Sequence, residues 1–91
     1  MPEFLVELYV ARSDDAAVAR DADGAQAASA ELTREGTPVR YLRSIFVPED
    51  ETCFVLYEAE SAAAVREAAL RAGLRFERIA EATVQSRGET R

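Results

Sequence analysis

The chain contains no histidine, no lysine and no tryptophan, and only one cysteine, among its 91 residues. Without histidine, it lacks the side chain that most often binds metals and carries protons near neutral pH. The single Cys53 excludes a disulfide within the chain and a cysteine-based metal cluster. The four glycines stand singly at 24, 36, 73 and 88, which excludes a phosphate-cradling loop. The familiar signatures of catalysis and of nucleotide binding are therefore absent.

The charge balance of the chain is acidic. Seventeen acidic residues stand against eleven basic residues, for a net charge of −6, and every basic residue is arginine. The arginines are scattered among acids, whereas a nucleic-acid-binding surface needs clustered cations. No apolar run approaches the roughly 20 residues that span a bilayer, and residues 2–11 have the pattern of a strand rather than of a signal peptide. We expect a cytoplasmic protein without nucleic-acid or membrane partners.

The length of the chain predicts one domain over residues 1–85, followed by a polar, frayed tail over residues 86–91. A chain of this size buries only about 60–65% of the surface that its unfolded form exposes. Its hydrophobic fraction is nevertheless 48%. We therefore expect apolar surface to remain after the core is filled, and such surface favours self-association.

The first part of the chain predicts a strand followed by a long helix. Apolar residues alternate with mostly polar ones over residues 3–11, which is typical of a strand with one face in the core. Ser13 is the predicted N-cap of a helix that runs to Glu35, and Gly36 is its stop. Gly24 costs about 1 kcal/mol relative to alanine in a helix interior, so a break at this residue stays open.

The rest of the chain predicts a hairpin, a second helix and a last strand. Residues 37–47 and 52–59 are strand-like, and the turn between them holds Pro48 and three acids. Ser61 is the predicted N-cap of a helix that Gly73 ends, with a Glu67–Arg71 pair on its polar side. Residues 76–84 form the predicted last strand.

This order predicts an α+β fold, the ferredoxin-like βαββαβ arrangement. Right-handed crossovers then give a four-stranded antiparallel sheet in the order 4-1-3-2, with both helices on one face. The other face is expected to carry large apolar residues, namely Leu5, Tyr9, Tyr41, Ile45, Phe54 and Leu56. A face of this kind is usually an interface, so we expect a homodimer whose two sheets pack face to face around a cavity.

Two segments carry a family resemblance: RYLRSIFVPEDETCFVLYEAES at residues 40–61 and AVREAALRAGLRFERIAEA at residues 64–82. The chain resembles a family of small bacterial domains of unknown function, common in actinobacteria, that includes nickel-responsive proteins. The resemblance extends from residue 2 to residue 81 and is most specific at residues 43–53 and 58–59. It implies a ferredoxin-like fold and pairing into a dimeric α+β barrel. Nickel capture in such proteins relies on histidine, which this chain lacks, so we expect no metal site and no cofactor.

Polar residues on the apolar sheet are the candidate site. Glu7 and Glu58 belong to the two strands predicted to be central, and Arg43 belongs to an edge strand. If all three face a partly dry cavity, one carboxyl pKa can rise enough for Glu7 or Glu58 to act as an acid or base. In the structural alternative, Arg43 pairs with Glu7 or Glu58, across the sheet or across the interface, and fixes the register of the strands.

Three further features have both a functional and a structural interpretation. Tyr9, Tyr41 and Tyr57 are candidate hydrogen-bond donors to a ligand, although strand tyrosines more often belong to a core or an interface. Cys53 is expected to be a small core residue with a raised pKa. The acidic turn at residues 49–51 is either a cation site or, more commonly, a solvated hairpin tip.

The preferred function is the binding of a small apolar or weakly cationic molecule in the cavity between two sheets. Its predicted lining is Glu7, Tyr9, Tyr41, Arg43 and Glu58. A second hypothesis is a cofactor-free enzyme of the monooxygenase, isomerase or cyclase type, because similar barrels host such activities; this rests on fold analogy alone. A third is a plain interaction module, and a fourth is a metal-responsive protein without histidine ligands.

Overall fold

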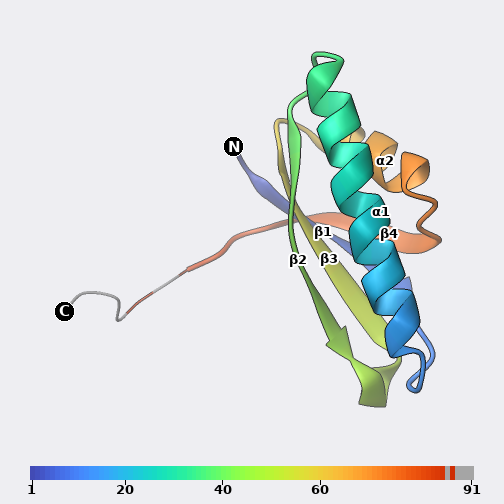
Figure 1. Cartoon of the computed structure of the whole chain (residues 1–91). Helices are drawn as coiled ribbons and strands as arrows, with labels where there is room; N and C mark the ends of the chain where they lie inside the picture. Colours follow the sequence, from blue (N-terminus) through green and yellow to red (C-terminus); the bar gives the residue numbers. More distant parts are fainter. Residues whose placement is uncertain (86, 88–91) are drawn as a thin grey trace.

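Seven elements make up the part of the chain that the computed structural model describes, residues 1–85 and 87 (Figure 1). In chain order they are β1 (Glu3–Tyr9), α1 (Asp15–Arg34), β2 (Val39–Val47), the 3-10 turn η1 (Pro48–Asp50), β3 (Thr52–Ala59), α2 (Ala62–Arg71) and β4 (Phe76–Ala82). The predicted element order is confirmed. The predicted tail at 86–91 lies, apart from Arg87, outside the described residues.

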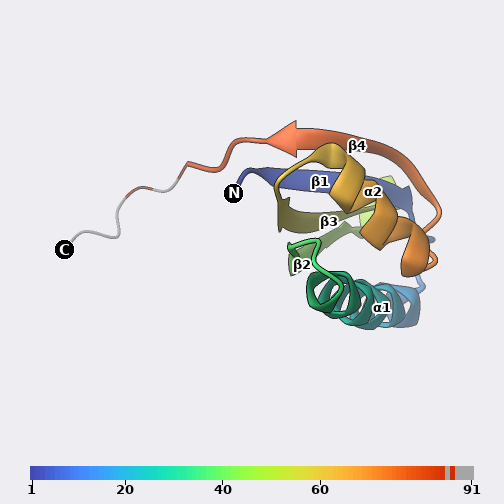
Figure 2. The same ribbon diagram turned by 90° about the horizontal axis from the view of Figure 1, so that it is seen from above.

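The four strands form one antiparallel sheet in the order β2-β3-β1-β4. This is the predicted order counted from the opposite edge, so the ferredoxin-like prediction is confirmed. Both helices lie on the same side of the sheet, with α1 along β2 and α2 nearer β4 and β3 (Figure 2). The core fills the space between sheet and helices, and its fully buried side chains include Val6, Cys53, Val55, Tyr57 and Val65.

The ends of α1 differ in one detail from the prediction. Asp14, not Ser13, is the N-cap, and its Oδ1 accepts a hydrogen bond from the Ala17 backbone N–H at 3.1 Å. Gly36 follows the C-cap with a φ of 104°, a conformation that disfavours side chains. Gly24 does not break the helix. A Cβ at residue 24 would lie 3.2 Å from the carbonyl oxygen of Ala72, so glycine lets the end of α2 approach closely.

The sheet face opposite the helices is called the open face. It consists of four rows across the strands: Arg40, Glu58, Glu3 and Ala82; Arg43, Leu56, Leu5 and Ala80; Ile45, Phe54, Glu7 and Arg78; and Val47, Thr52 and Tyr9. Five of the six apolar residues predicted for this face belong to these rows. No helix or strand among the described residues covers them (Figure 2).

A β-bulge in β2 moves the sixth residue, Tyr41, to the other face. The register shifts between Tyr41, which is opposite Tyr57, and Arg43, which is opposite Leu56. Tyr41 therefore packs against the core, with its ring 6.3 Å from that of Tyr57 and nearly perpendicular to it. The prediction that Tyr41 shares the open face with Arg43 is wrong, because the extra residue Leu42 interrupts the alternation.

Among the described residues, no helix is both long enough and apolar enough to cross a membrane.

Candidate functional site

The centre of the open face is apolar and belongs to the two central strands. Leu5 of β1 lies opposite Leu56 of β3, and Phe54 of β3 lies opposite Ile45 of the edge strand β2. Leu56 is 7% exposed, whereas Ile45 is 47% exposed and Tyr9, at the end of the face, is 60% exposed. Leu56 is thus covered by its neighbours, whereas Ile45 and Tyr9 are the large apolar side chains of this face that are exposed.

Charged residues of the open face form ion pairs that reach from the central strands to the edges of the sheet. Arg78 Nε on β4 donates to Glu7 Oε1 on β1 at 2.9 Å. Arg40 Nη2 on β2 donates to Glu58 Oε1 on β3 at 2.8 Å. Each pair joins residues directly opposite each other in the sheet, the arrangement that favours cross-strand contacts between opposite charges.

Arg43 is not the partner of either carboxylate. It lies opposite the apolar Leu56, is exposed, and forms no ion pair with any residue that the structure describes. The predicted pairing of Arg43 with Glu7 or Glu58 across the sheet is therefore wrong, and its pairing across an interface stays a prediction. Within the sheet, Arg78 and Arg40 take the place of Arg43. The bulge at Leu42 sets this arrangement, since it shifts Arg43 by one residue relative to β3.

The ion pairs limit what the open face can do chemically. Glu7 and Glu58 each accept hydrogen bonds from a guanidinium, so their charges are already balanced. They belong to different rows of the face, with the row of Arg43, Leu56 and Leu5 between them. A proton-transfer role for either carboxylate stays a prediction. Beside Glu7 lies a small pocket of about 120 Å³, whose lining includes Asp50, Glu51, Thr52 and Glu77.

The tyrosines are separated by the sheet. Tyr9 lies on the open face, but Tyr41 and Tyr57 lie on the helix-covered face. The Tyr41 hydroxyl is 2.8 Å from Ser44 Oγ. Tyr57 is fully buried, its hydroxyl makes no hydrogen bond within the described residues, and burial raises its pKa well above the ordinary value of 10.0. Of the three predicted donors, Tyr9 alone lies on the open face.

The donor groups of the chain do not fit a nickel site. Cys53 is 1% exposed, and burial raises the pKa of its thiol, which disfavours the thiolate that a metal needs. In the hairpin, the Glu51 carboxylate accepts a hydrogen bond from the Arg12 backbone N–H at 3.0 Å. Within residues 1–85 and 87, no three side chains of His, Cys, Asp or Glu lie close enough to hold a metal ion. Imidazole, a ligand that suits nickel, does not occur in this chain.

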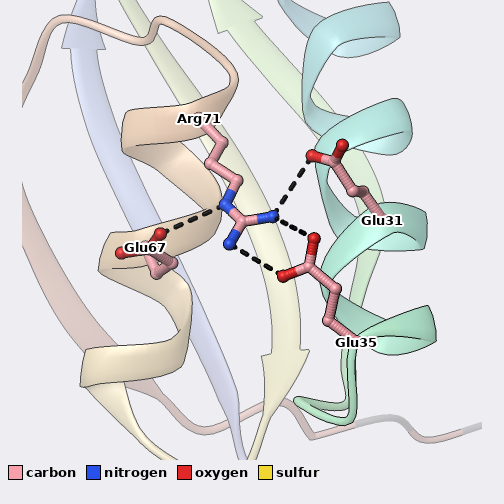
Figure 3. Close-up of polar contacts among 4 residues, drawn as sticks. All are labelled: Glu31, Glu35, Glu67 and Arg71. Carbon is pink, nitrogen blue, oxygen red and sulfur yellow. Dashed lines mark hydrogen bonds and ion pairs between the residues drawn. The ribbon is translucent and has the colours of Figure 1, made fainter.

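One charged cluster on the helix side goes beyond the predicted Glu67–Arg71 pair. Arg71 of α2 bonds Glu67 at 3.1 Å, Glu31 at 3.2 Å and Glu35 at 2.9 Å (Figure 3). The Glu35 contact is bidentate. Because Glu31 belongs to α1 and Glu35 is its C-cap, the cluster depends on how the helices cross, which spacing in the sequence does not reveal. Its role is to join α1 to α2.

Comparison with known proteins identifies relatives of this fold. Residues 8–82 match a protein family described as nickel responsive protein SCO4226-like, and this range includes both segments on which the predicted resemblance rests. The crystal structure of SCO4226 from Streptomyces coelicolor A3(2) is similar, with a TM-score of 0.64 and 21% sequence identity over 92% of this chain and 99% of that chain. At this identity the likeness supports the fold alone. Among curated proteins there is no match.

Proposed function

The chain belongs to the SCO4226-like family of nickel responsive proteins, and on this premise we propose that it acts as a homodimer whose two open faces enclose a small apolar molecule. The observation that carries the proposal is the uncovered apolar centre of the sheet, formed by Leu5, Phe54 and Leu56 on the central strands and Ile45 beside them. A second copy of the same face is a natural cover for it, since twofold interfaces are self-complementary.

The distribution of charge on the open face supports an interface. Arg40 and Arg43 belong to the edge strand β2 and Arg78 to the edge strand β4. Guanidinium groups at the edges of the sheet can stay in water when the apolar centre is covered. An apolar centre with a polar rim is the usual anatomy of a protein interface.

The chemistry of the open face favours an apolar ligand over a cationic one. Of the three carboxylates in the rows of the open face, Glu7 and Glu58 are already neutralised by Arg78 and Arg40. The third, Glu3, lies in the end row of the face, outside its apolar centre. The remaining central side chains offer hydrocarbon surface, and Tyr9 offers a hydroxyl at one end. Ligand sites of this kind are mostly apolar with few polar groups.

Nickel binding does not extend to this chain from the family description. The absence of histidine and the burial of Cys53 leave only carboxylates, a poor donor set for that ion. The lone buried thiol, without a disulfide partner in the chain, supports our placement of the protein in the reducing cytoplasm.

Native mass spectrometry of the protein taken gently from its host tests both parts of the proposal. We expect a dimer that carries additional mass, and the identity of that mass gives the ligand. A bare dimer would overturn the ligand and favour a plain interaction module. A monomer at concentrations of tens of micromolar would overturn the whole proposal, since an apolar face of this kind should associate in that range.

A matched pair of substitutions locates the interface. Ile45→Lys places a charge on the edge strand β2, beside the apolar centre of the open face. Leu70→Lys places the same charge on α2, where Leu70 is 58% exposed. We expect Ile45→Lys to weaken dimerisation by at least about tenfold, because each chain would lose an exposed apolar contact and bring a charge to the interface. Leu70→Lys should leave it unchanged. Equal dissociation constants for the two variants in analytical ultracentrifugation would exclude the open face.

A further inference from the structure

The two helices differ in length, and this difference leaves a cleft on the helix side of the sheet. α1 has 20 residues and α2 has 10. The end of α2 meets α1 near Gly24, where the Ala72 carbonyl approaches. The first turns of α1 therefore extend beyond α2 (Figure 1). A cleft of about 400 Å³ lies there, between α1, the end of β1 and the segment that follows α2.

The cleft, called the helix cleft, has an apolar floor and a charged rim. Leu8 and Val10 at the end of β1 line it, together with Ala17 of α1. Its charged residues are Asp14, Arg20 and Asp21 from the start of α1 and Arg75 from the segment after α2. The volume lies within the range of small-molecule sites, which runs from about 300 to 1,000 Å³.

The charges of the helix cleft do not neutralise one another. No ion pair in the described part of the chain involves Arg20, Asp21 or Arg75. Arg20 and Asp21 are adjacent on a helix, and adjacent helical residues point in different directions. Two guanidinium groups and a carboxylate therefore border one cleft with hydrogen-bonding capacity to spare.

Asp21 is the carboxylate with the strongest reason to bind a cation. It is half-buried, and this burial raises its pKa, with Asp14 adding to the rise and Arg20 opposing it. The Asp14 carboxylate is already used, since it caps α1 through Ala17. An ammonium group beside Asp21 would relieve the cost of holding that charge away from water.

We propose that the helix cleft binds a small zwitterion with an aliphatic tail, of the class of free apolar α-amino acids. Arg20 and Arg75 take its carboxylate, Asp21 takes its ammonium group, and the tail covers Leu8 and Val10. Arginine is suited to the carboxylate because its planar fork can donate two parallel hydrogen bonds. The site lies on the helix side of the sheet, and Tyr9, at the end of β1, is the residue of the open face that also borders it.

Titration of ¹⁵N-labelled protein with L-leucine, followed by amide chemical shifts, tests this proposal. We expect shifts confined to residues 8–11, 14–21 and 73–75. 4-Methylpentanoate lacks the ammonium group and leucinamide lacks the carboxylate, so each should bind at least about tenfold more weakly than L-leucine. Equal binding of 4-methylpentanoate would overturn the role of Asp21 and reduce the helix cleft to an anion site.

Substitutions with matched controls distinguish specific binding of L-leucine in the helix cleft from weak binding elsewhere on the surface. Asp21→Asn and Arg75→Gln should each weaken L-leucine binding by about tenfold, since each removes one charged hydrogen bond. Asp23→Asn and Arg34→Gln remove the same charges from positions of α1 outside the helix cleft and should have no effect. Absence of shifts at about 20 mM L-leucine, a concentration that would detect even millimolar dissociation constants, would overturn the proposal, and so would shifts located on the open face. Neither result would affect the proposed homodimer, because native mass spectrometry tests the homodimer separately.

Discussion

At the scale of single residues, two neighbouring tyrosine hydroxyls have different surroundings. The rings of Tyr41 and Tyr57 meet edge to face on the helix-covered side of the sheet. The Tyr41 hydroxyl is hydrogen-bonded to Ser44, at 2.8 Å, whereas the Tyr57 hydroxyl is buried without a partner among the described residues. A buried hydroxyl without a hydrogen bond costs about 1–3 kcal/mol of stability.

This difference predicts opposite effects of the same small change. Tyr57→Phe should raise the free energy of unfolding by about 1 kcal/mol, because it removes an unsatisfied polar atom from the core. Tyr41→Phe is the matched control and should lower it by a similar amount, because it breaks the bond to Ser44. Chemical denaturation measures both. A loss of stability in Tyr57→Phe would show that its hydroxyl has a partner after all.

Residue types at the candidate site were predictable, but their partners were not. An acid within an apolar strand must find a counter-charge, so the sequence predicts an arginine partner for Glu7 or Glu58. In the structure both acids have one. Which arginine pairs with each depends on the register of three strand pairs. Arg78 and Arg40 lie directly opposite the two acids, and nothing in the linear order distinguishes them from Arg43.

At the scale of elements, the bulge in β2 accounts for the largest error in the predicted site. Alternation over residues 39–47 places Tyr41, Arg43 and Ile45 on one face, but the extra residue Leu42 moves Tyr41 to the other. Bulges follow from the twist and packing of a sheet and have no strong signature in sequence. The face of every residue before the bulge is therefore uncertain from sequence alone, whereas Ile45 and Arg43 after it are placed correctly relative to each other.

For the two helices, the ends were predictable from local sequence signals, whereas the contacts between the helices were not. Capping residues and glycines locate α1 and α2 to within about two residues, because these signals act within one turn. The continuity of α1 through Gly24 and the contacts of Arg71 with Glu31 and Glu35 depend on the crossing of the helices. Glycine at residue 24 has a low helix propensity, and the close approach of Ala72 explains its presence.

The Arg71 cluster predicts a measurable dependence of stability on pH. Hydrogen bonds from Arg71 lower the pKa of Glu35 below its ordinary value of 4.5. A carboxyl whose pKa is lower in the folded state contributes stability above pH 4.5, and this contribution is lost as the pH falls through the folded-state pKa. We therefore expect Arg71→Gln to lower the melting temperature at neutral pH and to lose less stability than the wild type on acidification below pH 4.5.

A double-mutant cycle with Glu35→Gln isolates that contribution. The coupling between residues 35 and 71 should be present at about pH 7 and vanish near pH 2, as followed by thermal melts in the same buffers. The raised pKa of Asp21 contributes to the pH dependence of stability in the opposite direction. This contribution is the same in the wild type, the two single variants and the double variant, so it cancels from the coupling. The coupling should be modest and fall with added salt, because the cluster is exposed. A coupling that persists unchanged in acid would contradict the assignment.

At the scale of the whole molecule, the fold was predictable because several independent signals agree. Strand alternation, two capped helices and a short hairpin leave few arrangements once crossovers are right-handed. The same alternation gives the apolar centre of the open face. The helix cleft was not predictable, because it results from the difference in length between α1 and α2 and from where they meet, and its charged residues Arg20, Asp21 and Arg75 belong to no recognisable motif.

Dimerisation through the open face predicts that stability depends on protein concentration. If only the folded chain associates, each tenfold rise in concentration stabilises the dimer by about 1.4 kcal/mol. For two chains of 91 residues this corresponds to a melting temperature higher by about 3–5 °C. Thermal melts between about 1 and 100 µM should show this rise in the wild type and in Leu70→Lys, and a smaller rise in Ile45→Lys. A melting temperature independent of concentration in the wild type would mean that the apolar centre of the sheet stays in water, a state for which Ile45 and Phe54 are poorly suited.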